Sequence, residues 1–200
     1  MQKRIAVLVS NAGKGSNLQA IINAVEKKEI SCKIAVVVSD KEDAYGLVRS
    51  KKHNIPSEVN KNKDNLVPLL KKYKVDYVIL TGWKQFMTDG FIDTYKNKIL
   101  NLHPGLIPDV INGVVKNPDG TIGLWNKGKF TDKALQNFFD QKTTYAGSSI
   151  HFLTHEFDFG PVLGRCFEKI KRGDTIDSLY KRLKVKENKL YVNVLKKLCQ

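Results

Sequence analysis

Short apolar runs alternate with amphipathic segments through the first half of the chain. The runs are rich in β-branched residues and lie at positions 5–9, 34–38, 77–80 and 99–102. Continuous runs of this kind are typical of strands that are covered on both faces of a sheet. Between the runs, apolar residues recur at helical spacing, at Leu18, Ile21, Ile22 and Val25, and at Leu66, Leu69, Leu70 and Tyr73. This alternation predicts an α/β fold with a doubly wound, mostly parallel sheet, in which residues 55–59 form a weaker edge strand.

The second half of the chain has a different pattern. Strand-like runs at residues 149–153 and 162–170 are separated only by Gly160-Pro161 and a short acidic loop. We expect these two strands to pair antiparallel and to extend the sheet. Asp174-Thr175 then provides a helix N-cap. A long closing helix follows, with apolar positions at Ile176, Leu179, Leu183, Leu190, Val194 and Leu198.

Residues 109–130 fit neither pattern. Turn-forming residues dominate there, as in Asn117-Pro118-Asp119-Gly120 and Asn126-Lys127-Gly128-Lys129. A structureless loop of this length inside a compact domain is usually functional or disordered. Since 200 residues suit one domain with a substantial core, we predict a single domain over residues 1–200 with a long loop insertion at about residues 109–130.

Composition narrows the class of protein. The apolar content of 42% is ordinary for a globular protein, and no apolar stretch approaches the length that spans a bilayer. The three cysteines are widely spaced and form no Cys-x-x-Cys pair. This spacing argues against a disulfide framework or a zinc site and fits a reducing cytosol. We therefore expect a cytoplasmic protein that needs no metal.

The net charge of +14 raises the alternative of a nucleic-acid or membrane-surface partner. The excess is nearly all Lys, and the Lys clusters are scattered, without the interleaved aromatic residues that stack bases. A solvated Lys-rich surface is therefore favoured over a nucleic-acid-binding face. A positive field would also attract phosphorylated small molecules, so charge alone does not choose between these partners.

Candidate chemistry is concentrated in the motif at residues 101–108, which follows the run at 98–100. Asn101 and His103 occupy alternate positions of an extended segment, so their side chains point to the same side. Pro104 favours an extended conformation at His103 itself. The motif predicts a carboxamide and an imidazole held together where a strand opens into a loop, a common location for chemistry in α/β folds.

A glycine-rich turn near the N-terminus, residues 13–19, follows the first strand and opens the first helix. Backbone N–H groups and the positive end of a helix would face an anion there. Ser16-x-x-Gln19 also has the pattern of a capping box. The turn is neither the dinucleotide-binding fingerprint nor the Walker sequence.

A third motif lies late in the chain, at residues 149–161, and contains His151, His155 and Asp158-x-Gly160-Pro161. Taken in this order, the three motifs resemble the folate-dependent formyltransferases, most closely those that act on glycinamide ribonucleotide in purine biosynthesis. The resemblance runs from about Ile5 to Leu198 and implies the family's Rossmann-like fold.

The resemblance implies transfer of the formyl group of 10-formyltetrahydrofolate to the amine of glycinamide ribonucleotide. This reaction passes through a tetrahedral carbon bearing an oxyanion, and a donor aimed at such charge contributes roughly 2.7–4 kcal/mol. A protonated His103 and the amide of Asn101 would be those donors. A group that accepts and donates a proton is also required, and the resemblance assigns this role to Asp158, with water relaying protons. His151 would support the site.

The resemblance also implies the binding residues. The substrate phosphate would lie on Gly15, Ser16 and Asn17. Lys184 matches a family residue near that phosphate, and Glu187 matches a carboxylate that binds substrate hydroxyls. Without the resemblance, Lys184 and Glu187 would be interpreted as an exposed helix pair. The folate would be held by the segment around residues 82–92, with backbone groups near Lys84 and Gln85 and an apolar slot made by Phe86, Met87 and Ile92, together with Asn101.

The sequence departs from the family's pattern at two places. The family often has an Arg where this chain has Gln85, which puts affinity for the folate's glutamate tail in question. The insertion at residues 109–130 follows the catalytic motif directly, so it could act as a lid, an oligomer contact or a determinant of the acceptor amine.

Several alternatives stay open at this stage. Methionyl-tRNA formyltransferases carry an Arg-Gly loop and a C-terminal RNA-binding barrel, and neither is present here. A sugar-nucleotide formyltransferase shares the Asn, His and Asp set, although the Gly15-Ser16-Asn17 turn favours a ribonucleotide. A catalytically inactive basic binding module would not need all of Asn101, His103 and Asp158. We therefore expect small-molecule substrates, no membrane partner, and a monomer or homodimer.

Overall fold

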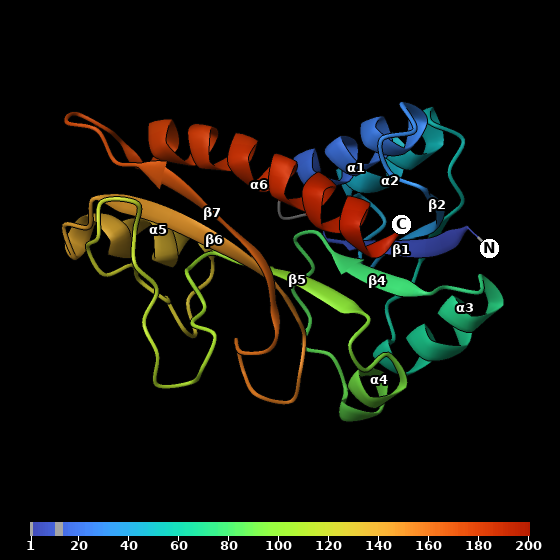
Figure 1. Cartoon of the computed structure of the whole chain (residues 1–200). Helices are drawn as coiled ribbons and strands as arrows, with labels where there is room; N and C mark the ends of the chain where they lie inside the picture. Colours follow the sequence, from blue (N-terminus) through green and yellow to red (C-terminus); the bar gives the residue numbers. More distant parts are fainter. Residues whose placement is uncertain (1, 11–13) are drawn as a thin grey trace. The chain divides into compact units, whose positions relative to one another are not determined.

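The computed structural model describes residues 2–10 and 14–200 (Figure 1). The chain divides into two compact units, residues 1–101 together with 191–200, and residues 102–190. The strands form one sheet with the order β3-β2-β1-β4-β5-β6-β7. The predicted mostly parallel sheet with antiparallel C-terminal strands is confirmed.

The first unit contains the parallel part of the sheet. Its strands are β1 (Lys3–Val9), β2 (Cys32–Ser39), β3 (Ser57–Val59), β4 (Tyr77–Leu80) and the first residues of β5 (Ile99–His103). All of its strand pairs are parallel. Residues 5–9 and 34–38 are buried throughout, which explains why these runs carry no polar alternation. β3 forms the edge, as predicted for residues 55–59.

Helices connect these strands and cover both faces of this part of the sheet, α1 and α2 on one face and α3 and α4 on the other (Figure 1). Their bounds are α1 (Ser16–Glu26), α2 (Tyr45–Lys52), the 3-10 turn η1 (Lys63–Asn65), α3 (Leu66–Lys72) and α4 (Asp89–Thr94). The apolar positions predicted to face the sheet include Leu18, Ile21 and Leu70, and all three are buried. Helical spacing therefore identified the packed faces correctly.

The predicted capping box at the start of α1 is wrong. The N-cap is Gly15, in a left-handed conformation with φ 64°, and no side chain caps the helix. Ser16 is already the first helical residue, and the Gln19 side chain donates instead to Asn23 Oδ1 at 2.8 Å. A glycine adopts the left-handed conformation without steric cost, so the turn could place the helix start one residue earlier than the motif suggested.

The second unit contains α5 (Thr131–Asp140), β6 (Tyr145–Phe152), β7 (Val162–Lys169) and the first part of α6 (Ile176–Leu198). β6 and β7 pair antiparallel from Tyr145 opposite Lys169 to His151 opposite Val162. The predicted hairpin is therefore confirmed, with β6 beginning earlier than the apolar pattern indicated.

The predicted N-cap of the closing helix is also confirmed. The Thr175 hydroxyl accepts from the Ser178 backbone N–H at 3.2 Å. Arg182 donates to Asp174 Oδ2 at 2.6 Å and to Glu168 Oε1 at 2.8 Å, which ties the helix start to β7. The hydrogen bond from Arg182 holds the pKa of Asp174 well below its usual value.

The segment at residues 109–130 is not structureless. Lys116 and Ile122 form an antiparallel bridge, and the Asn117 backbone N–H donates to Thr121 O at 2.8 Å. The loop therefore turns back on itself around Asn117-Pro118-Asp119-Gly120. The turn-forming residues predicted a loop, and their local hydrogen bonds give that loop a defined shape. Among the described residues, no helix is both long enough and apolar enough to cross a membrane.

Candidate active site

Strand β5 presents the first two candidate catalytic residues. Asn101 and His103 lie at alternate positions of this strand, as predicted, so their side chains leave the same face. His103 is only 2% exposed, whereas Asn101 is half-buried. The strand ends at His103, so the imidazole is held by regular structure at the point where the chain turns into Pro104.

Asp158 lies beside His103 within the second unit. The distance from His103 Nδ1 to Asp158 Oδ1 is 3.5 Å. Asp158 adopts a left-handed backbone conformation with φ 50°, and its Oδ2 accepts from the Gly128 backbone N–H at 2.8 Å. Burial raises the pKa of this carboxyl, but the hydrogen bond and charge of His103 and the Gly128 N–H together hold it below its usual value. The arrangement therefore keeps an ionised carboxylate next to the imidazole.

The second ring nitrogen of His103 contacts the loop insertion. His103 Nε2 lies 2.6 Å from the Trp125 carbonyl oxygen. The Trp125 indole N–H donates to the Asp158 carbonyl oxygen at 3.0 Å, and its ring lies 5.8 Å from the Phe159 ring. Sequence reasoning missed Trp125 and Gly128. The available signal was the position of the insertion directly after the motif containing His103.

His151 of β6 lies close enough to His103 and Asp158 to interact with them electrostatically. Its side chain is fully buried. Burial, and then the charge of His103, lower the pKa of His151 to about 4. The His151 imidazole is therefore neutral near pH 7, and the supporting role that the resemblance implies for it stays a prediction. His155 is exposed, outside this cluster.

The glycine-rich turn is described from Lys14 onward, and Gly13 lies outside the described residues. Gly15 and Ser16 stand at the start of α1, followed by Asn17, which is 7% exposed. Arg49 of α2 donates through Nε to the Lys14 carbonyl at 2.8 Å and through a terminal nitrogen to Gln19 Oε1 at 2.5 Å. Sequence reasoning missed Arg49, which adds a cation to this turn and had no local motif to reveal it.

Lys184 and Glu187 form an ion pair on α6, with 2.5 Å between Lys184 Nζ and Glu187 Oε2. Glu187 is 2% exposed and accepts from the Ser148 hydroxyl of β6 at 2.7 Å. Burial lowers the pKa of Lys184, but the Glu187 carboxylate outweighs it and the net pKa is raised. Interpreting these residues as an exposed helix pair is therefore wrong, because the helix turns Glu187 towards β6.

The candidate folate segment follows β4 in the first unit. The Lys84 backbone N–H donates to Ser10 Oγ at 3.3 Å, and the Gln85 side chain donates to Asp40 Oδ2 at 3.1 Å. Phe86 is 64% exposed, Met87 is half-buried, and Ile92 is buried in α4. The segment thus contains one exposed aromatic ring and two less exposed apolar side chains.

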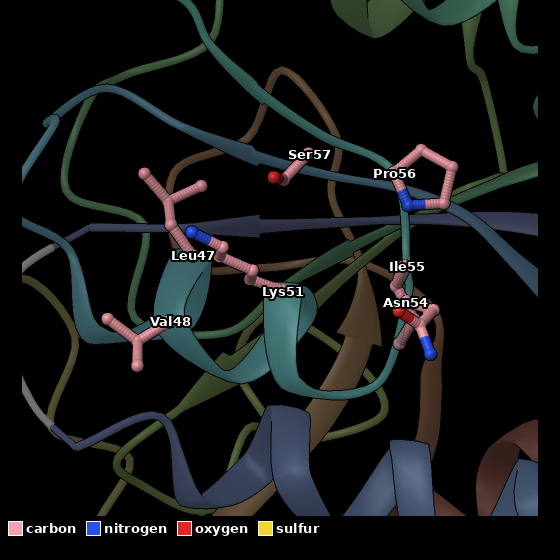
Figure 2. Close-up of a pocket in the computed structure, with 7 residues that line it drawn as sticks. All are labelled: Leu47, Val48, Lys51, Asn54, Ile55, Pro56 and Ser57. Atoms are coloured by element: carbon pink, nitrogen blue, oxygen red, sulfur yellow. The ribbon is translucent and has the colours of Figure 1, made fainter.

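A surface depression of about 610 Å³ lies elsewhere, between α2 and β3. Figure 2 shows its lining, which is Leu47, Val48, Lys51, Asn54, Ile55, Pro56 and Ser57. The lining includes none of the site residues predicted from the sequence, all of which lie in the described part of the chain.

Comparisons with known proteins show the family of this chain. Residues 3–195 match the family model described as "Formyl transferase". Phosphoribosylglycinamide formyltransferase of Haemophilus influenzae is 33% identical, over 97% of this chain and 86% of its own length. Human trifunctional purine biosynthetic protein adenosine-3 is 29% identical over 94% of this chain, which matches 17% of that longer protein. The crystal structure of phosphoribosylglycinamide formyltransferase from Anaplasma phagocytophilum is 28% identical, with a TM-score of 0.85 over 100% of this chain and 88% of that one.

Proposed function

Because this chain belongs to the formyl transferase family, we propose that it transfers a formyl group from 10-formyltetrahydrofolate to the amine of glycinamide ribonucleotide. The observation that carries the proposal is the contact between His103 and Asp158 at the end of the strand that also presents Asn101. The names of the relatives support the choice of acceptor. An inactive binding module would not need a buried imidazole beside a carboxylate in this way.

The chemistry requires one bond to form and one to break. The acceptor amine nitrogen attacks the formyl carbon and makes a tetrahedral centre that bears an oxyanion. The carbon–nitrogen bond to the folate then breaks, leaving formylated ribonucleotide and tetrahydrofolate. One proton leaves the attacking amine, and one proton reaches the departing folate nitrogen. Asn101 and His103 would donate hydrogen bonds to the oxyanion, His103 from a ring nitrogen that contacts the Trp125 carbonyl or Asp158 in the absence of substrate. Each such donor is worth roughly 2.7–4 kcal/mol.

Asp158 has two roles in this scheme. Its Oδ1 lies 3.5 Å from His103 Nδ1 and would hold the imidazole in its orientation. Its oxygens also accept the proton that leaves the amine, directly or through a water, and return it to the folate nitrogen. The Gly128 N–H holds one carboxylate oxygen, so Oδ1, on the His103 side, is the oxygen placed for exchange.

The resemblance to the family supports the choice of substrate-binding residues. The phosphate would be held by the N–H groups at the start of α1, around Gly15, Ser16 and Asn17, with Lys184 as a further cation. Glu187 would bind the ribose hydroxyls. The folate would lie against Phe86, Met87 and Ile92, with backbone groups near Lys84 hydrogen-bonding it. Gln85 is already hydrogen-bonded to Asp40, so Lys84 is the better placed of the two side chains to meet an acidic folate tail.

A turnover assay tests this proposal. Purified protein is mixed with 10-formyltetrahydrofolate and glycinamide ribonucleotide, and the release of tetrahydrofolate is followed by absorbance. We expect turnover by the wild type and none by His103→Ala, which should retain ribonucleotide affinity. Turnover at near-normal rate by His103→Ala would remove His103 from the chemistry. Folate binding without turnover would mean that the acceptor is a different amine.

A further inference from the structure

The backbone of Asp158 adopts a conformation that few residues other than glycine adopt. Its φ is 50°, in the left-handed region. Asn and Asp enter this region more readily than other residues, but the surrounding structure has to hold them there. In this conformation Asp158 Oδ1 lies 3.5 Å from His103 Nδ1. The contacts that hold the backbone of Asp158 therefore also hold its carboxylate beside His103.

Hydrogen bonds within the Asp158 loop, residues 153–161, close the loop on either side of Asp158. The Phe159 backbone N–H donates to Glu156 O at 3.2 Å, and the Thr154 hydroxyl donates to Phe159 O at 2.8 Å. Neither of these two bonds includes an atom of Asp158. They give the loop a defined shape, but they do not fix the carboxylate.

The loop insertion contacts Asp158 directly through segment 125–128. The Trp125 indole N–H donates to the Asp158 carbonyl oxygen at 3.0 Å, and the Gly128 backbone N–H donates to Asp158 Oδ2 at 2.8 Å. The Trp125 ring also lies near the Phe159 ring, with 5.8 Å between the ring centroids. One hydrogen bond fixes the peptide unit that follows Asp158 and the other fixes the carboxylate, so together they hold both the backbone and the side chain.

Segment 125–128 is itself anchored beside the end of β5. Asn126 is 6% exposed, and its side chain donates to Pro104 O at 3.0 Å and accepts from the Asn137 side chain of α5 at 2.7 Å. The Trp125 carbonyl oxygen lies 2.6 Å from His103 Nε2. The segment therefore contacts the chain at His103 and the chain at Asp158, and it keeps the two at a fixed separation.

An ion pair at the rim of this contact adds little. Lys127 Nζ lies 3.0 Å from Glu156 Oε1, and the two side chains are 40% and 50% exposed, so solvent screens their attraction. The position of Asp158 therefore depends mainly on the Trp125 indole and on the Gly128 N–H.

We propose that Trp125 is a positioning residue, which holds Asp158 in its left-handed conformation through the indole N–H and so keeps the carboxylate beside His103 during formyl transfer. This inference rests on the proposed function. It gives the loop insertion the role of supporting the catalytic pair, in place of a lid, an oligomer contact or a determinant of the acceptor amine.

Hydrogen exchange in the wild type tests the contact without any substrate. The protein is labelled with nitrogen-15, and exchange of the Gly128 amide and of the Trp125 indole N–H is followed by NMR. Gly128 is exposed, so burial alone would not protect its amide. We expect both groups to exchange at least about tenfold more slowly than in an unfolded chain, as for a hydrogen bond of ordinary net strength. Exchange as fast as in an unfolded chain would overturn the inference.

Trp125→Phe keeps an aromatic ring and removes the indole N–H. In this variant the Gly128 amide should exchange about tenfold faster, and kcat should fall about 100-fold because the carboxylate is displaced, with KM for the ribonucleotide unchanged. Val114→Ala is the matched control, because Val114 lies in the same insertion with its side chain exposed, and it should change kcat by less than about twofold. An unchanged kcat in Trp125→Phe, or a raised KM alone, would overturn the positioning role.

Combining Trp125→Phe with Asp158→Asn separates a positioning role from a general loss of structure. Because Trp125 acts through the Asp158 carboxylate, Trp125→Phe should lower kcat by no more than about threefold in the Asp158→Asn background. A further fall of about 100-fold in that background would overturn the inference, since the two residues would then act independently.

The exchange measurement also keeps this inference distinct from the proposed function. It uses the wild type alone, so it decides whether the contact exists even if Trp125→Phe fails to fold. Slow exchange at Gly128 and Trp125 in a protein that shows no turnover would support the contact and count against the proposed function alone.

Discussion

Replacing Asp158 with Asn gives a sensitive test of the catalytic pair. The change removes a negative charge while keeping the shape of the side chain, and the new amide oxygen can still accept from the Gly128 N–H. His103 is 2% exposed and the Asp158 side chain 17% exposed, so solvent screens their interaction only partly. The variant should therefore fold normally and lose catalytic power.

The magnitude follows from the geometry. If the imidazole carries a proton in the transition state, two unit charges 3.5 Å apart attract each other by about 5 kcal/mol at an effective dielectric constant of about 20. Proton transfer by a positioned carboxylate is worth about 10²–10⁴ in rate, or about 3–5 kcal/mol at 1.36 kcal/mol per tenfold. The two figures agree, so we expect kcat for Asp158→Asn to fall about 1000-fold, with KM for the ribonucleotide unchanged.

Steady-state kinetics with both substrates checks this prediction. Glu156→Gln is the matched control, because Glu156 lies in the same loop, is half-exposed and pairs with Lys127. Its removal changes net charge equally and should leave kcat within about threefold of the wild type. If Asp158→Asn keeps near-normal kcat, the assignment fails. If both variants lose activity equally, a general field effect is responsible and the specific contact is not.

Two further predictions concern stability and binding. Burial lowers the pKa of His151 from 6.5 to about 4, so the unfolded chain binds the proton first and the free energy of unfolding falls by about 3 kcal/mol as the pH drops from about 6.5 to about 4. Urea unfolding at several pH values should show a weaker pH dependence of the free energy of unfolding for His151→Gln. An identical pH dependence in the variant and the wild type would contradict the lowered pKa of His151. Ser148→Ala removes the hydrogen bond that Glu187 Oε1 accepts from Ser148, which should cost about 1–3 kcal/mol of stability and raise KM for the ribonucleotide. Ser57→Ala is the control, because Ser57 is exposed. An unchanged KM in Ser148→Ala would remove Glu187 from the binding site.

The sequence by itself determined the elements and the main catalytic motifs. A strand that is buried on both faces is apolar at every position, and a helix that packs on one face has apolar residues three or four positions apart. The pattern alone therefore predicts strands β1, β2 and β4 and helices α1 and α3. Alternation along a strand also placed Asn101 and His103 on one side. These are local properties, which depend on neighbours in the chain.

The tertiary structure decided which distant residues meet. No local pattern distinguishes a buried Glu187 from an exposed one, because its burial depends on Ser148 of β6. The predicted capping box at Ser16 was wrong because Gly15, in a left-handed conformation, is the N-cap of α1. The loop insertion looked featureless, yet it delivers a carbonyl to His103 and an N–H to Asp158. Every residue has the same backbone groups, so the sequence does not show which of them will make a contact through its main chain.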